Sequence, residues 1–129
     1  MDVFVYGTLT NPDQVARVVD SYVFVGPATL HGLHLVAGRT PTLAPGGQAG
    51  GRLLRTDEVA RLDAYERVDE GLYVRVSVPR MDGGTAAVYV GDPDRVDAAV
   101  DWPGTGTFAD RVHDYVAQAD VSVEALIDR

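Results

Sequence analysis

Apolar and polar residues alternate over several short runs of the chain, and this alternation predicts β-strands. The clearest run is 72–78, in which every second residue is Leu or Val and the residues between them include Tyr, Arg and Ser. The predicted strands are 2–6, 22–25, 30–36, 52–54, 72–78 and 85–90. Asp-Gly-Gly at 82–84 is a turn sequence, so the last two strands form a hairpin.

Three other segments carry apolar residues at helical spacing, which predicts helices over 10–20, 56–67 and 108–117. Each has a start signal. The first has Thr10 or Asn11 as N-cap with proline in its first turn, the second has Thr56 as N-cap, and the third has the Thr-x-x-Asp sequence 107–110. A final short turn is predicted from Ser122 onward.

Residues 39–51 are rich in glycine and proline, so a loop is predicted there, covering a site or joining a hairpin. Gly26-Pro27 predicts a break between two strands. Because strands come in runs with helices inserted between them, the order favours an α+β fold with a mainly antiparallel or barrel-like sheet. A chain of 129 residues is expected to form one domain, 1–129.

The charge is strongly acidic and uniform in kind. The formal net charge is −8, every one of the 11 basic residues is arginine, and 15 of the 19 acids are aspartate. This composition is typical of a protein kept soluble in concentrated salt, and a GC-rich genome is the alternative explanation. In both cases the charge argues against nucleic acid or an anionic membrane as a partner.

The residue types also limit the chemistry. The sequence has no cysteine, so it has no thiol nucleophile, disulfide or cysteine-based zinc site. Its three histidines do not have metal-ligand spacing, and no metal site is expected. No signal peptide or membrane-spanning run is recognised, so the expected location is the cytoplasm.

The first candidate for function is Tyr6-Gly7-Thr8-Leu9, which follows a predicted strand and precedes a predicted helix. Glycine at such a position lets successive backbone N–H groups point toward one ligand, and the helix start adds positive potential. The turn is therefore a candidate cradle for a carboxylate. The alternative is a tight turn that binds nothing.

The second candidate is Glu66, in the last turn of the predicted helix 56–67. There the negative end of the helix dipole disfavours its charge. With partial burial, its pKa would rise into the range that suits a general base near neutral pH. Asp63 lies one turn earlier and could form a carboxylate pair with it. The alternative is an exposed glutamate paired with Arg61 or Arg67.

Taken together, these segments resemble the gamma-glutamylcyclotransferase-like family. The resemblance rests on VFVYGTL at 3–9, PTLAPGG followed by GGRLL within 41–54, LDAYERVDEGLYVRVSV at 62–78, and AAVYV at 86–90. It covers residues 1 to about 91 in the family's order. In many members glycine follows the helix-end glutamate, whereas Arg67 stands there in this chain.

The resemblance implies a compact, mixed, mainly antiparallel barrel-like sheet with surrounding helices, and a cavity at the YGTL turn. It implies an enzyme that converts a γ-glutamyl amine or peptide to 5-oxoproline and a free amine, with no cofactor. Glu66 would be the catalytic base and later acid, and the substrate would be bound by Tyr6, Gly7, Thr8, Leu9 and Tyr73. The alternatives are a non-catalytic small-molecule-binding or regulatory member of the same fold and a related acyltransfer activity.

Overall fold

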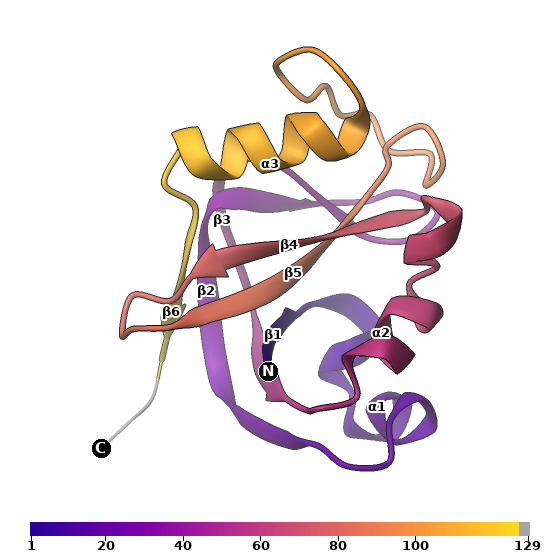
Figure 1. Cartoon of the computed structure of the whole chain (residues 1–129), viewed down its shortest axis with the longest axis vertical. Coiled ribbons are helices and arrows are strands. Elements are labelled where there is room, and N and C mark those ends of the chain that lie inside the picture. Colours follow the sequence, from indigo (N-terminus) through magenta and orange to yellow (C-terminus); the bar gives the residue numbers. More distant parts are fainter. Residues whose placement is uncertain (127–129) are drawn as a thin grey trace.

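One curled sheet joins the strands in the computed structural model, which describes residues 1–126. Its strands are β1 (Asp2–Val5), β2 (Val23–Val36), β3 (Thr42–Arg55), β4 (Tyr73–Pro79), β5 (Thr85–Gly91) and β6 (Ser122–Ala125). The order across the sheet is β4-β5-β1-β3-β2-β6 (Figure 1). Only the β1–β5 pair is parallel among the described strands; the other neighbours are antiparallel.

The two edges of this sheet approach each other, so that the sheet forms a half-barrel. Just beyond the end of β4, Arg80 forms an isolated bridge with Val123 of β6, the strand at the opposite edge. The N–H of Met81 donates to the Val123 carbonyl at 2.8 Å. The predicted α+β class, with a mixed, mainly antiparallel and barrel-like sheet, is therefore confirmed.

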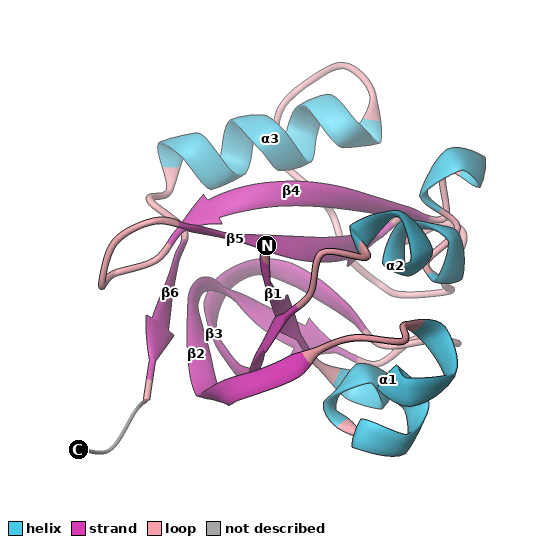
Figure 2. Ribbon diagram, turned by 60° about the horizontal axis from the view of Figure 1, so that its bottom comes forward, coloured by secondary structure: helices cyan, strands magenta, loops and turns pink. Residues whose placement is uncertain are grey.

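The helices within residues 1–126 are α1 (Pro12–Val18), α2 (Val59–Tyr65) and α3 (Phe108–Gln118), with single 3₁₀ turns η1 (Gly7–Thr10) and η2 (Val68–Glu70). Asn11 caps α1 through its side chain, and Thr107 with Asp110 forms a capping box on α3, as the sequence predicts. In Figure 2, α3 lies over β4, and α1 and α2 lie together at another side of the sheet. None of the helices in the described part is long and apolar enough to cross a membrane.

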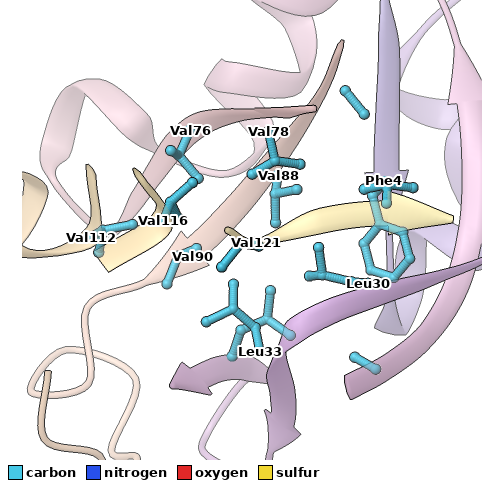
Figure 3. Packing of buried hydrophobic residues seen from close by; sticks show 14 of the residues in the cluster. Phe4, Leu30, Leu33, Val76, Val78, Val88, Val90, Val112, Val116 and Val121 are labelled. Carbon is cyan, nitrogen blue, oxygen red and sulfur yellow. The ribbon is translucent and has the colours of Figure 1, made fainter. Parts of the chain in front are cut away.

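Two apolar clusters lie on the two faces of β1, because successive side chains of a strand point to opposite faces. Phe4 points into the cluster under α3, where Val112 and Val116 of the helix pack near Val76 of β4 (Figure 3). Val3 and Val5, in contrast, belong to the second cluster, which includes buried residues of α1 and α2. Burial on both faces fixes β1 in the sheet, and with it the turn that follows.

The predicted loop over 39–51 is wrong for most of its length, because β3 begins at Thr42. Strands β2 and β3 instead form one long antiparallel ribbon from Val23↔Arg55 to Val36↔Thr42. The predicted break at Gly26-Pro27 is likewise only a register shift inside β2. Hydrogen bonding along the partner strand outweighs the low strand propensity of glycine and proline here.

Two smaller predictions also need correction. Helix α2 begins at Val59, since the hydroxyl of the buried Thr56 donates to the Ser21 carbonyl at 2.7 Å and accepts from the Glu58 N–H at 3.1 Å. Thr56 therefore ties α2 to the segment before β2 and is not its N-cap. The segment from Ser122 is a strand that pairs with β2.

Candidate active site

A cavity of about 360 Å³ opens between the turn after β1 and the end of α2. This volume is within the usual range for small-ligand sites. The residues that line it come from β1 and η1, the loop before β3, the end of α2, and strands β4 and β5. They are Phe4, Val5, Tyr6, Gly7, Thr8, Leu9, Thr40, Pro41, Tyr65, Glu66, Arg67, Leu72, Tyr73 and Tyr89. All six predicted site residues are therefore brought together around one cavity.

The turn after β1 presents the start of a 3₁₀ helix to this cavity. Tyr6 is still extended, and Gly7 turns the chain with φ of +69°, a value that glycine adopts without strain. The N–H groups of Gly7 and Thr8 precede the first i→i−3 hydrogen bond of this one-turn helix and have no acceptor within it. Leu9 is buried and anchors the turn. The turn can therefore offer several N–H groups to an anion.

Glu66 forms the C-terminal cap of α2, and its backbone N–H donates to the Leu62 carbonyl at 2.9 Å. Its side chain is half-buried, and its carboxylate forms no ion pair or hydrogen bond with any residue in 1–126. Burial raises the pKa of Glu66 from its ordinary value of 4.5 to about 7. A carboxylate with this pKa can both accept and return a proton near neutral pH.

Two charged residues near Glu66, Asp63 and Arg61, pair with other partners. Asp63 accepts from the Tyr89 hydroxyl at 2.7 Å and lies 3.2 Å from Arg75, so it does not form a carboxylate pair with Glu66. Arg61 lies 3.1 Å from Asp20 and 3.4 Å from Glu58. Glu66 is thus the carboxylate in the cavity lining, and it has no counter-ion among the described residues.

Three tyrosines form the cavity wall near Glu66: Tyr73 and Tyr89 are buried, and Tyr6 is half-buried. Tyr73 donates to the Pro41 carbonyl at 2.7 Å, and Tyr6 donates to the backbone carbonyl of Tyr89. Burial raises the pKa of each of the three phenols, and the nearby Glu66 charge raises it further. All three are therefore neutral hydrogen-bond donors at neutral pH.

Tyr65 also lines the cavity, although its spacing from Val59 and Leu62 is that of the apolar face of a helix. Its hydroxyl lies 3.2 Å from the Thr8 hydroxyl and accepts from Gln14 Nε2 at 3.2 Å. The side chain is 38% exposed, whereas Val59 and Leu62 on the same face are buried. The sequence signal that could have identified Tyr65 as a site residue is its position directly before Glu66.

Arg67 is exposed and adopts the left-handed conformation, with φ of 53° and ψ of 46°. This conformation explains why glycine suits the position after the glutamate.

No group of three or more His, Asp or Glu side chains within residues 1–126 could hold a metal ion.

Comparisons with known proteins identify the family and the fold of the chain. The family model described as gamma-glutamyl cyclotransferase, AIG2-like, matches residues 3–105. No curated protein matches the sequence.

Several solved structures share the fold. One titled gamma-glutamyl cyclotransferase is 20% identical with a TM-score of 0.58, and the match covers 71% of this chain and 66% of that one. An uncharacterized protein from Homo sapiens is 22% identical with a TM-score of 0.61, covering 70% of this chain and 66% of that one. Protein ytfP from Escherichia coli is 29% identical with a TM-score of 0.58, covering 71% and 83%. The chain thus spans 66% of the length of the first two.

Proposed function

Because the chain belongs to the gamma-glutamyl cyclotransferase, AIG2-like family, we propose that it is a cyclotransferase. It converts a γ-glutamyl amine or peptide to 5-oxoproline and a free amine. The observation that carries this proposal is the placement of Glu66, whose carboxylate lacks a counter-ion among the described residues, in the same cavity as the Tyr6–Leu9 turn. The raised pKa of Glu66, about 7, supports a role in proton transfer.

The reaction needs only groups that the substrate and this cavity supply. The α-amine of the γ-glutamyl group attacks the γ-carbonyl carbon, a C–N bond forms, and the bond to the leaving amine breaks. The α-amine is mostly an ammonium at neutral pH, since its reference pKa is about 8, and it must first lose a proton. Glu66 accepts this proton and donates it to the leaving nitrogen. After the attack the α-nitrogen still carries one proton too many, which Glu66 accepts in turn and passes to the released amine. The products are then 5-oxoproline and an ammonium, and the atoms balance without water or a co-reactant.

The turn after β1 supplies the substrate's orientation in this proposal. Backbone N–H groups of the Tyr6–Leu9 turn, those of Gly7 and Thr8 above all, would bind the α-carboxylate, with the side chains of Tyr6 and Tyr73 as the wall beside it. Binding at that end folds the γ-glutamyl chain so that its amine faces its own carbonyl. Orientation of this kind can remove several kcal/mol from the barrier of an intramolecular reaction.

The test is mass spectrometry of a mixed library of γ-glutamyl amines and γ-glutamyl peptides before and after incubation with the protein. We expect 5-oxoproline and one class of free amine to accumulate with the wild-type protein. We expect Glu66→Gln to abolish this release while the fold and ligand binding persist. The matched control is Glu70→Gln, because Glu70 is exposed and does not line the cavity.

Two results would overturn the proposal. Equal turnover by wild type and Glu66→Gln would remove Glu66 from the chemistry. Binding of γ-glutamyl compounds by the wild type with no 5-oxoproline at any pH from 6 to 9 would instead identify a binding or regulatory member of the family.

A further inference from the structure

Six hydroxyl-bearing side chains line the cavity, and four of them already donate their hydroxyl proton to another group of the protein. These four are Tyr6, Thr40, Tyr73 and Tyr89. Tyr6 donates to the Tyr89 carbonyl, Tyr73 donates to the Pro41 carbonyl, and Tyr89 donates to Asp63. A phenol has one proton to donate, so none of the three tyrosines retains one for a ligand.

The hydroxyl proton of Thr40 is also donated within the protein, to the Tyr73 oxygen. Its hydroxyl lies 2.9 Å from the Tyr73 hydroxyl. Because the Tyr73 proton goes to the Pro41 carbonyl, Thr40 must be the donor of this contact. The remaining two hydroxyls of the cavity lining are those of Thr8 and Tyr65.

Thr8 and Tyr65 together keep one free proton. Their hydroxyls are 3.2 Å apart, and one of their two protons makes the bond between them, whichever residue donates it. Gln14 Nε2 donates to the Tyr65 oxygen and therefore consumes no hydroxyl proton. Neither hydroxyl donates to any other acceptor within residues 1–126. One O–H group of the pair thus remains available to a ligand.

The position of this pair matches a need of the proposed reaction, on which this inference rests. When the α-amine attacks, negative charge develops on the γ-carbonyl oxygen, and a positioned donor stabilises it. Thr8 belongs to the turn proposed to hold the α-carboxylate, and Tyr65 directly precedes Glu66. The pair therefore joins the two parts of the cavity between which the reacting carbonyl would lie.

We propose that the Thr8–Tyr65 hydroxyl pair is the side-chain donor to the oxyanion of the cyclisation, and that Gln14 positions Tyr65 for it. The pair has a property that a single donor lacks. Removing one hydroxyl frees the proton of the other, since the bond between them is lost. Each single variant thus keeps one free donor, and the double variant keeps none.

The experiment measures kcat and KM for 5-oxoproline release by Thr8→Val, Tyr65→Phe and the combined variant. We expect each single variant to keep kcat within about tenfold of the wild type. We expect the combined variant to lose about 10²- to 10³-fold in kcat, the loss typical of a missing oxyanion donor, with KM little changed. The pH dependence set by Glu66 should be the same in all variants.

Comparison variants separate the alternatives. Tyr22→Phe is the matched control, since the Tyr22 hydroxyl donates to the Pro12 carbonyl outside the cavity. Arg67→Ala tests the alternative that the oxyanion donor is Arg67, the cationic residue of the lining. If Thr8→Val/Tyr65→Phe fails to fold, Thr8→Ser and Thr8→Ala are compared in the Tyr65→Phe background, where only Ser should retain turnover.

The inference is overturned if the combined variant keeps kcat within threefold of either single variant, if the loss falls on KM, or if Arg67→Ala alone abolishes turnover. These results all require an active wild type, so they leave the proposed function standing. A wild type that releases no 5-oxoproline overturns both.

Discussion

At the scale of single residues, Glu66 combines a functional position with a cost to stability. Its pKa is about 7 in the folded protein and 4.5 in its ordinary state, so between these values the folded state binds more protons than the unfolded state. Stability therefore falls as pH rises from about 4.5 to 7, and the full cost remains above 7. This is the opposite of the usual effect of a paired carboxylate.

We expect Glu66→Gln to be more stable than the wild type at pH 8 by about 1–3 kcal/mol, because the glutamine never carries the buried charge. The difference should disappear near pH 4, where Glu66 is protonated in both states. Urea unfolding at several pH values measures it. Glu70→Gln, an exposed control, should show no such pH-dependent gain, and a Glu66→Gln gain that is constant with pH would contradict the assignment.

Tyr73 has a positioning role in the structure, because its only hydroxyl proton is donated to the Pro41 carbonyl. We expect Tyr73→Phe to lose about 1–2 kcal/mol of stability, since the Pro41 and Thr40 groups lose their partner. The loop that carries them lines the cavity, so KM should rise several-fold while kcat is largely kept. Steady-state kinetics and urea unfolding measure both. A selective loss of kcat would instead make Tyr73 a donor to the reacting atoms.

At the scale of elements, the sequence predicts those whose signals are local. Helix α3 begins at the predicted Thr107 cap, and the hairpin of β4 and β5 turns at the predicted Asp-Gly-Gly. The ribbon of β2 and β3 could not be predicted from local signals. Its register shift between His31 and Leu33 places two residues of β3, 46 and 47, opposite a single residue of β2. The glycine and proline residues of that segment pair with β2 and pack closely against neighbouring strands. Residues far away in the sequence determine both, so local sequence signals do not show them.

In the candidate site, too, residues with a local sequence signal could be predicted and those defined by tertiary contacts could not. Glu66 and the turn at Gly7 are recognisable because a helix end and a strand end are local features and because they match the family's pattern. Tyr65 was missed as a site residue, since helical spacing with Val59 and Leu62 is also the spacing of a core face. Only the contact with Thr8, 57 residues away in the sequence, shows that Tyr65 is a site residue and not a core residue.

The end of α2 offers a test of backbone strain. Arg67 has φ of 53°, which costs an L-residue about 1–2 kcal/mol relative to the right-handed region. We expect Arg67→Gly to be more stable than Arg67→Ala by about 1 kcal/mol, because both variants remove the side chain and only glycine relieves the strain. Thermal and urea unfolding of the pair measure this difference.

The control is the same pair of substitutions at Arg61, an exposed position inside α2. There the order should reverse, with alanine more stable than glycine by about 1 kcal/mol, because glycine weakens a regular helix. Equal preference at the two positions would show that Arg67 is not held in the left-handed region in solution.

Gly51 of β3 tests how the ribbon packs against β1. A Cβ atom placed on Gly51 would lie 2.3 Å from the Val5 carbonyl oxygen and 2.7 Å from Phe4 Cζ. We expect Gly51→Ala to destabilise the protein by about 1–3 kcal/mol, as overpacking usually does. Turnover should also fall, because Val5 leads directly into the Tyr6–Leu9 turn. Gly50→Ala is the matched control, since nothing lies within 4 Å of its Cβ position.

At the scale of the whole molecule, two effects of salt oppose each other. The exposed ion pairs, such as Arg61–Asp20, weaken as salt screens them, but each such pair contributes only about 0–1 kcal/mol. The acidic residues outnumber the basic ones, which gives the net charge of −8, and the repulsion among the excess negative charges destabilises the folded state at low salt. Arg80, 9% exposed and paired with Asp2 and Asp82, is screened less than the surface pairs.

We therefore expect the free energy of unfolding to rise by about 1 kcal/mol or more between 0.1 and 1 M KCl, as the Debye length falls from about 10 to about 3 Å. Urea unfolding at each KCl concentration measures it. The matched variant replaces three exposed aspartates, Asp69, Asp101 and Asp114, with asparagine and so reduces the charge from −8 to −5. It should be more stable than the wild type at 0.1 M and gain less from salt, because less repulsion remains to be screened. If stability is flat or falls with KCl in the wild type, the salt-adapted interpretation of the composition is wrong and its Arg- and Asp-rich surface reflects base composition alone.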